Sequence, residues 1–359
     1  MAMVEAQVTG GGAMAALRRA EPVVIPVLAL LAGLAVFALF LLTQGRSPIA
    51  FFGYVWQGAF GSAFSWMNTL SRAAPLLLAA LCVALPARLG LVVIGGEGAI
   101  VLGGLAAGAV ALPLAGVPAV IGLPLMAASA MAVGAVWIGM AGALRHYRGV
   151  NETISSLLLA YIAIALMNHL VEGPLRDPES LNKPSTAPLD EALRVGMIPG
   201  MDVHWGLVFG AIACVVAWVL VERTRWGFAA RIAGGNVRAA EVQGLPVGRL
   251  ILGFTALGGA CAGLAGFFEV AAVHGSANAS LAAGYGYTGI LIAFLARHNA
   301  MAIIPVAILL AGFDASSGLI QRRMDLPDAT MQVLQGIVFM AILMSDAAYG
   351  RLAFFKAKG

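Results

Sequence analysis

The sequence predicts an all-α polytopic membrane protein with about ten transmembrane helices. Residues 23–42 carry no charged, amide or hydroxyl side chain. Twenty residues of α-helix reach about 30 Å, the thickness of the hydrocarbon core of a bilayer. The whole 359-residue chain is 61% apolar and only 11% charged, whereas a soluble globular chain is about 25% charged. Most of the chain is therefore expected to lie in lipid.

The other apolar segments follow one another along the chain, separated by Gly, Pro and short polar clusters. Together they form one transmembrane domain, residues 23–346, between an N-terminal segment (1–22) and a tail (347–359). The second and the last segment are short for a full crossing. The ten expected spans are residues 23–42, 73–85, 91–112, 117–144, 154–170, 205–221, 250–268, 281–296, 301–319 and 331–344.

The distribution of basic residues predicts the orientation in the membrane. If the N-terminus lies inside and the spans alternate, the inside segments hold about twice as many lysines and arginines as the outside segments. The positive-inside rule then places both termini in the cytoplasm. The net charge of +4 is small and spread over the loops, so membrane lipid, rather than nucleic acid, is the expected surface partner.

Two loops are longer than a simple connection requires. The outer one, residues 171–204, contains five prolines and mixed charges, and we expect it to form ordered structure. The inner one, residues 222–249, is basic. Within it, Asn236 is a good N-cap, Glu241 can pair with Arg238, and Gly244 is a good residue to follow the last turn. The sequence thus predicts a short helix over 236–243 that a cytoplasmic partner can contact, or else a basic loop against phospholipids.

The inner loop resembles the coupling loop of permeases from ATP-binding cassette (ABC) importers. The signature of the branched-chain amino acid, simple sugar and nucleoside superfamily is R-x-x-G-x-N-x-x-A-A-x-x-x-G-[IL]-x-V-x-R. By this resemblance, the loop docks a separate ATPase, and Arg238 and Glu241 lie within the docking helix. The residues that match the signature are Arg231, Gly234, Asn236, Ala239, Ala240, Gly244, Leu245, Val247 and Arg249.

Two further segments are similar to motifs of the nucleoside-type members, in the same order along the chain. Residues 150–163, VNETISSLLLAYIA, match one of them, and residues 90–108 match the pattern G-L-x-N-I-G-x-E-G-x-x-x-[IL]-G. Val93 and Ala160 replace asparagines of these motifs, which favours a less polar or differently shaped ligand. Within residues 90–108, the residues that match this pattern are Gly90, Leu91, Ile94, Gly95, Glu97, Gly98 and Gly103.

The resemblance implies the fold of a vitamin B12 importer-type (type II) permease in a bacterial plasma (inner) membrane. It also implies a second permease subunit, often a different homologous chain, two ATP-binding subunits, and a periplasmic or lipoprotein solute-binding protein. The sequence contains no GxxxxGK[ST] phosphate loop. This chain is therefore expected to be a transport component that binds no cofactor, with ATP used by its partners.

Glu97 is the most informative residue inside the membrane. It lies about six residues into the third expected span, where an ionised side chain costs about 2.5–3.5 kcal/mol. Gly95, Gly96 and Gly98 surround it and allow a helix or a ligand to approach the backbone. Two roles are open: a group in the substrate path that accepts a hydrogen bond, or a structural carboxylate bonded to a neighbouring helix.

A second candidate for the substrate path is the Gly/Ala/Ser-rich stretch between the seventh and eighth spans. Irregular backbone at membrane depth is tolerated where it is buried in protein or lines a cavity. Phe267 and Phe268 can stack on a flat ring, although ordinary packing explains them equally well. Polar groups surround the same stretch: Glu269, His274, Asn278, Tyr285 and Tyr287.

Three functions compete: an ABC permease for a nucleoside, nucleobase, simple sugar or related solute, an ion-coupled secondary transporter with Glu97 as its proton site, and a membrane enzyme. The enzyme is the weakest, because no span carries an HExxH, a GxSxG or a paired-acid pattern. The motif matches favour the permease over the secondary transporter. No residue is assigned to catalysis or to a metal site.

Overall fold

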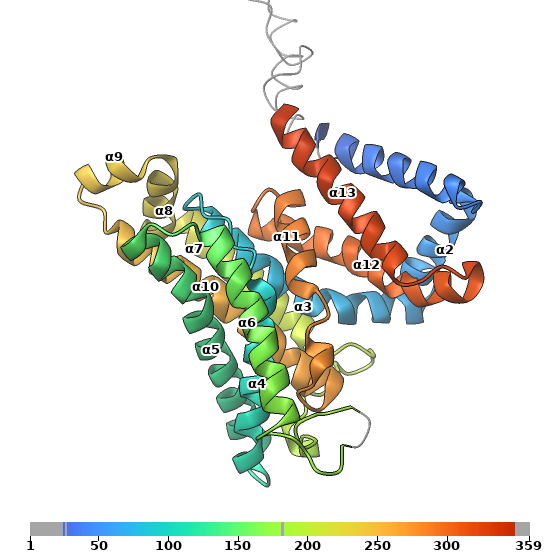
Figure 1. The fold of residues 1–359 in the computed structure, drawn as a ribbon, viewed down its shortest axis with the longest axis horizontal. Coiled ribbons are helices and arrows are strands. Elements are labelled where there is room, and N and C mark those ends of the chain that lie inside the picture. The colour runs from blue at the N-terminus through green and yellow to red at the C-terminus, as the bar shows by residue number, and fades with distance from the viewer. Residues whose placement is uncertain (1–23, 26, 181–182, 349–359) are drawn as a thin grey trace, which may run out of the picture. The chain divides into compact units, whose positions relative to one another are not determined.

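The computed structural model describes residues 24–25, 27–180 and 183–348. The described chain is helical and contains no β-sheet (Figure 1). The expected N-terminal segment, 1–22, lies outside the described residues, as does the tail from residue 349 onward. The structure divides into two compact units: unit 1, with the described residues of 1–56 and 316–359, and unit 2, residues 57–315.

Each of the ten expected spans contains a helix in the described part of the chain. Seven helical segments are long and apolar enough to cross a membrane, or eight if the helix Val27–Thr43 and α2, which are bent by 119°, form one span. The chain is thus an all-α polytopic membrane protein, while the count of ten crossings stays a prediction. The helices are α2 (Pro48–Phe60), α3 (Ala63–Ala87), α4 (Gly96–Ala111), α5 (Ala119–Arg148), α6 (Glu152–Glu172), α7 (Gly206–Arg223), α8 (Arg225–Gly235), α9 (Val237–Val242), α10 (Val247–Phe268), α11 (Tyr285–Leu295), α12 (Ala300–Met324) and α13 (Ala329–Ala348).

Unit 1 packs the helix Val27–Thr43 against α13. Gly33 makes the approach possible, because a Cβ atom there would lie 3.0 Å from the Cα of Val338. The aromatic rings of Phe37 and Phe51 meet with centroids 5.1 Å apart, and both side chains are fully buried. A small apolar core therefore holds this unit together.

Three long helices of unit 2 lie mostly inside it, and three lie mostly at its surface. In the most apolar stretch of each helix, 78%, 67% and 67% of the residues of α3, α4 and α10 are buried. The corresponding shares for α5, α6 and α7 are 22%, 33% and 28%. α10 packs on α3, α4 and α5. The exposed side chains of α5, α6 and α7 are mostly apolar, as expected for lipid-facing surfaces.

Two features differ from the expected spans. The second span is a full 25-residue helix, α3, and not the short segment 73–85. In its polar first half, side chains find partners in neighbouring segments: Thr69 donates a hydrogen bond to the carbonyl of Ala59 at 2.8 Å, and Ser71 donates one to the carbonyl of Asp202 at 3.3 Å. The third span begins at Gly96 and not at residue 91, so the position expected for Glu97, six residues inside a helix, is wrong.

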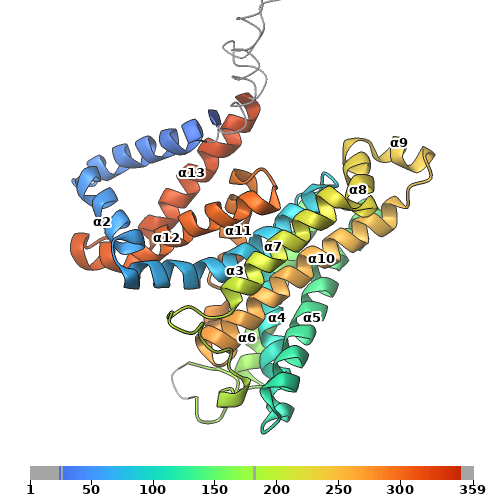
Figure 2. The ribbon, with the colours of Figure 1, turned by 180° about the vertical axis from the view of Figure 1, so that it is seen from behind.

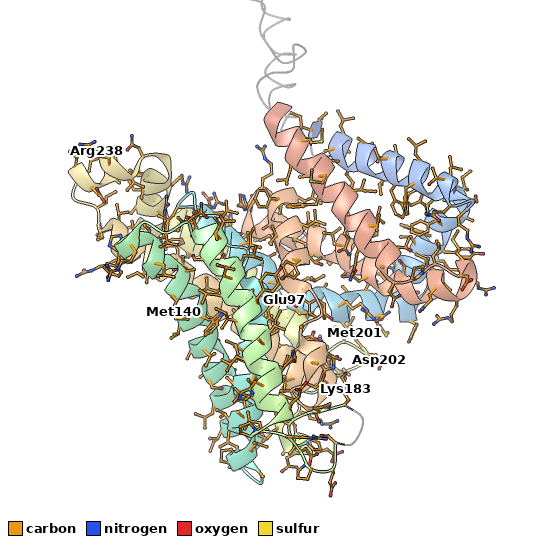
Figure 3. The ribbon with its side chains drawn as sticks, in the orientation of Figure 1. Glu97, Met140, Lys183, Met201, Asp202 and Arg238 are labelled. Carbon is orange, nitrogen blue, oxygen red and sulfur yellow. The ribbon has the colours of Figure 1, made fainter. Side chains whose placement is uncertain are left out.

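The two long loops lie at opposite ends of unit 2. Figures 1 and 2 show α8 and α9 projecting at one end, and the segment between α6 and α7 at the other end. In Figure 3, Arg238 marks the tip of α9, Lys183 marks the opposite end, and Glu97 lies between them. We refer to these as the α9 end and the loop end.

Candidate functional site

Glu97 joins the beginnings of two helices. It lies in the first turn of α4 and is 1% exposed. Its two carboxylate oxygens accept hydrogen bonds from the backbone N–H groups of Gly284, at 2.7 Å, and Gly286, at 2.6 Å. Gly284 is the N-cap of α11, so the carboxylate sits at the N-terminus of both α4 and α11. Helix N-termini carry partial positive charge and stabilise an anion.

The glycines near Glu97 are needed for close packing. A Cβ at Gly98 would lie 2.7 Å from the Cα of Ala160 in α6, and a Cβ at Gly286 would lie 2.2 Å from the backbone nitrogen of Glu97. Neither position leaves room for a larger residue. Gly95 also abuts α6, whereas Gly96 has only ordinary contacts. The replaced positions Val93 and Ala160 are both fully buried.

Residues 91–95 are not helical because side chains at the start of α6 bind their backbone. Ile94 donates to the hydroxyl of Ser156 at 3.1 Å, and the hydroxyl of Thr153 donates to the carbonyl of Val92 at 2.8 Å. The Glu152 carboxylate accepts from Val92 at 3.4 Å and pairs with Arg145 at 3.4 Å. This non-helical segment carries the chain from the end of α3 to the start of α4.

The second candidate region is irregular, as expected. α10 continues as a π-helical turn, Glu269–His274, which ends at Gly275 with φ 70°. Asn278 accepts from the backbone of Ser280 at 2.9 Å and so caps the short turn Ala279–Leu281. Tyr285 begins α11, and the Tyr287 side chain in the same turn is 40% exposed. π-helical turns often occur at functional sites.

Phe267 and Phe268 pack inside unit 2. They are 4% and 3% exposed. The ring of Phe268 lies 5.0 Å from that of Phe267, 5.8 Å from that of Phe209 and 6.2 Å from that of His204. Their surroundings match the packing explanation more closely than a free stacking surface.

Glu269, which begins the second candidate region, is a second buried acid. It is 2% exposed, and His274 contacts it at 3.5 Å. Arg72 is close enough to interact with it electrostatically. Its position one residue after an apolar helix marks it in the sequence, but its contact with His274 depends on the π-helical turn. Among the described residues, no three His, Cys, Asp or Glu side chains gather as a metal site would require.

The short helix predicted over residues 236–243 is present as α9. Asn236 accepts from the backbone of Ala239 at 3.0 Å. The helix ends in a Schellman motif, in which Gly244, with φ 78°, and Leu245 donate to the carbonyls of Glu241 and Ala240. Of the predicted coupling residues, Ala240 is buried, and the exposed ones are Arg231, Gly234, Asn236, Arg238, Ala239, Glu241, Gly244 and Arg249.

An open groove of about 430 Å³ lies beside α9. Its walls come from the end of α5, from Glu241 in α9, and from the start of α10. Arg238 and Glu241 do not form the expected ion pair, since neither has an ionic partner within 4 Å in the described chain. The lining residues are His146, Tyr147, Glu241, Gly244, Leu245, Pro246, Val247, Gly248, Arg249 and Leu252.

An ionic network that sequence analysis did not foresee lies at the α9 end. Glu222, at the end of α7, binds Arg231 of α8 at 2.9 Å and Arg88, the C-cap of α3, at 3.5 Å. Arg88 also donates to the backbone carbonyl of His298, between α11 and α12, at 3.0 Å. Burial, with Arg88 and Arg297 nearby, lowers the pKa of His298 to about 4. No local pattern signals contacts between residues so far apart in sequence.

The loop end is built from backbone hydrogen bonds. In the outer loop, three backbone N–H groups donate hydrogen bonds to carbonyls of the segment after α10. The pairs are Thr186 with Ala277, Leu189 with Gly275, and Val195 with Ala271. These bonds agree with the prediction that the loop has defined structure over its described residues. Its Lys183 also donates to the hydroxyl of Ser280.

Known proteins resemble this chain over most of its length. The family model described as "Branched-chain amino acid transport system / permease component" matches residues 65–343. The glucose ABC transporter permease protein TsgB13 of Haloferax volcanii is 35% identical over 89% of this chain and 87% of its own length.

The names of two further relatives give other solutes. The guanosine ABC transporter permease protein NupP of Bacillus subtilis is 29% identical over 95% of this chain and 99% of its own length. The probable riboflavin import permease protein RfuC of Treponema pallidum is 26% identical over 73% and 70%. The helical membrane fold, the capped α9 and these matches lead to one conclusion: the chain belongs to the family of branched-chain amino acid transport system permease components, and is a permease subunit of an ABC transporter.

Proposed function

We propose that this subunit forms half of the route through which an ATP-driven importer carries a small polyhydroxylated solute, such as a sugar or a nucleoside. The observation that carries the proposal is α9, an exposed helix that is capped at both ends by the residues of the coupling signature. The ATP is hydrolysed by separate subunits that dock there. The second permease, the two ATP-binding subunits and the solute-binding protein complete the proposed complex.

The solute class is inferred from what the named solutes of the relatives share. Glucose, guanosine and riboflavin each contain a chain or ring of adjacent hydroxyl groups, while their remaining parts differ. Hydroxyl groups need paired donors and acceptors in a partly apolar route. Of these three relatives, the glucose permease has the highest identity, which favours a sugar as the first solute to test.

We propose that the solute passes the irregular backbone between α10 and α11. Asn278, Tyr285 and Tyr287 supply side-chain donors and acceptors along this route. Glu97 and its neighbours Gly95, Gly96 and Gly98 form one side of the route. Glu97 contributes by fixing the start of α11, because both of its oxygens already accept backbone hydrogen bonds. Phe267 and Phe268, at the end of α10, pack in the core next to this region.

In the proposed orientation, the α9 end faces the cytoplasm and both termini lie on that side of the plasma membrane. The basic residues of α8 and α9 support this orientation. The loop end then faces outward, where the solute-binding protein docks. Mixed charges on that loop are suited to steering an approaching protein.

The test is a substitution on the exposed face of α9. Ala239→Glu should prevent the ATP-binding subunits from copurifying and abolish ATP-dependent uptake of labelled glucose, because Ala239 is exposed whereas Ala240 packs inside. Arg148→Glu is the control, since Arg148 is equally exposed at the end of α5. Uptake that follows a proton gradient and continues without ATP would instead favour the secondary transporter.

A further inference from the structure

One short stretch of chain reaches both ends of α11. Arg88 binds the carbonyl of His298 just beyond the C-terminus of α11, and Glu97 binds Gly284 and Gly286 at its N-terminus. The 11 residues of α11 span about 16 Å. The chain between Arg88 and Glu97 is not helical over residues 91–94, and nine residue steps can reach up to about 30 Å, which is enough to cover that length. We call residues 88–97 the strut.

The charges of the strut match the dipole of α11. The carboxylate of Glu97 lies at the positive N-terminal end, and the guanidinium of Arg88 lies at the negative C-terminal end. Each placement stabilises the helix. Reversed or absent charges would leave α11 held by its packing on α3 and α4, with Gly289 against the backbone of Ala79.

The carbonyl that Arg88 binds belongs to an unusual turn. Arg297 and His298 have φ values of 51° and 56°, in the left-handed region that non-glycine residues adopt infrequently. Such a conformation persists when surrounding contacts fix it. The hydrogen bond from Arg88 is one of these contacts, so the conformation of the turn depends on the position of Arg88.

The strut also contacts the loop that docks the ATPase. Glu222 holds Arg88 and Arg231 together. The backbone gives a second contact, because a Cβ at Gly234 in α8 would lie 2.4 Å from the carbonyl oxygen of Arg88. A displacement of α8 therefore pushes directly on the first residue of the strut.

We propose that the strut transmits movement of the docking loop to α11, and so to the irregular backbone beside Glu97. Arg88 and Glu222 are positioning residues in this scheme. It rests on the proposed function, since it requires an ATPase docked on α9. The contacts of Arg88 and Glu97 at the two ends of α11 both affect the position of this helix. Coupling between distant sites requires such a shared element.

The experiment uses the complete transporter in proteoliposomes and measures solute uptake per ATP hydrolysed. Glu222→Gln leaves α9 and the bond from Arg88 to His298 in place, so the ATPase should remain bound. We expect a fall of about tenfold in uptake per ATP, equal to about 1.4 kcal/mol of coupling. Arg88→Gln should give a similar fall, and the double variant should be no worse than either single variant.

Matched controls separate this inference from the proposed function. Arg148→Gln removes one exposed charge outside the network and should keep the wild-type ratio. If Glu222→Gln and Arg88→Gln keep the wild-type ratio, or if their effects multiply in the double variant, the strut does not transmit the movement. If the wild-type complex shows no ATP-dependent uptake, the proposed function fails first.

Hydrogen exchange supplies a second measurement should Arg88→Gln fail to assemble. In the wild-type complex, docking of the ATPase should change the exchange of the amides at residues 284–286. Glu222→Gln should abolish that change while the ATPase stays bound. An unchanged response in Glu222→Gln would overturn the proposal.

Discussion

Glu97 and Glu269 are both buried acids of unit 2, yet their surroundings differ. They are 1% and 2% exposed. Glu97 accepts two short backbone hydrogen bonds at the start of a helix, whereas the carboxylate of Glu269 contacts the Nε2 atom of His274 at 3.5 Å. Burying a charge costs less when the charge is hydrogen-bonded than when it is not. Burial alone therefore does not assign a role to an acid; its partners do.

The largest expected effect is on the folded state, from replacing Glu97. Glu97→Leu leaves two buried N–H groups without acceptors, at about 1–3 kcal/mol each, so the yield of folded complex should collapse. Glu97→Gln keeps one acceptor and should give an intermediate melting temperature. Thermal unfolding in detergent measures both variants, with Glu172→Leu, at the exposed end of α6, as the control. A wild-type melting temperature for Glu97→Leu would contradict the structural role.

Replacing Glu269 should have a smaller effect on stability and a larger one on transport. Glu269→Gln removes a charge but leaves no backbone donor unpaired, so the protein should fold with nearly wild-type yield. Because Glu269 lies beside the irregular backbone of the proposed route, uptake should fall severalfold at unchanged ATPase binding. If Glu269→Gln unfolds the complex as Glu97→Leu does, the contrast between the two acids is lost.

The smallest expected effect extends the comparison to a base, His298. Burial and two nearby arginines lower its pKa to about 4, against about 6.5 when unfolded. The unfolded chain thus binds a proton more readily, and His298 contributes stability that is present above pH 6.5 and lost as the pH falls toward 4. The loss should reach about 2 kcal/mol, after allowance for the partly exposed side chain.

Melting temperatures between pH 7 and pH 4 measure this loss. In His298→Asn, which keeps a residue type tolerant of the left-handed backbone, the decline over that interval should be smaller. His169 lies near the end of α6, and His169→Asn is the control. An identical pH dependence in wild type and His298→Asn would show that another group is responsible.

The α9 helix was predictable because its signals are local. Asn236 and Gly244 lie within nine residues of each other, and capping needs only neighbouring backbone. The extent of α3 was not predictable, because its first half carries polar side chains, two of which find their partners in other segments, at Ala59 and Asp202. Glu97 was recognisable as a buried acid, but its partners lie 187 and 189 residues away. Contacts of that range leave no periodic pattern in the sequence.

The separation of Glu97 from its partners also constrains how the protein is made. At about 5–20 residues per second, a ribosome needs roughly 10–40 s to synthesise the 187 residues between Glu97 and Gly284. During that time the carboxylate has neither backbone donor, so placing it inside the membrane costs about 2.5–3.5 kcal/mol unless it stays in water or at the membrane surface. The hydrogen bonds that fix the start of α4 form only after α11 has been made.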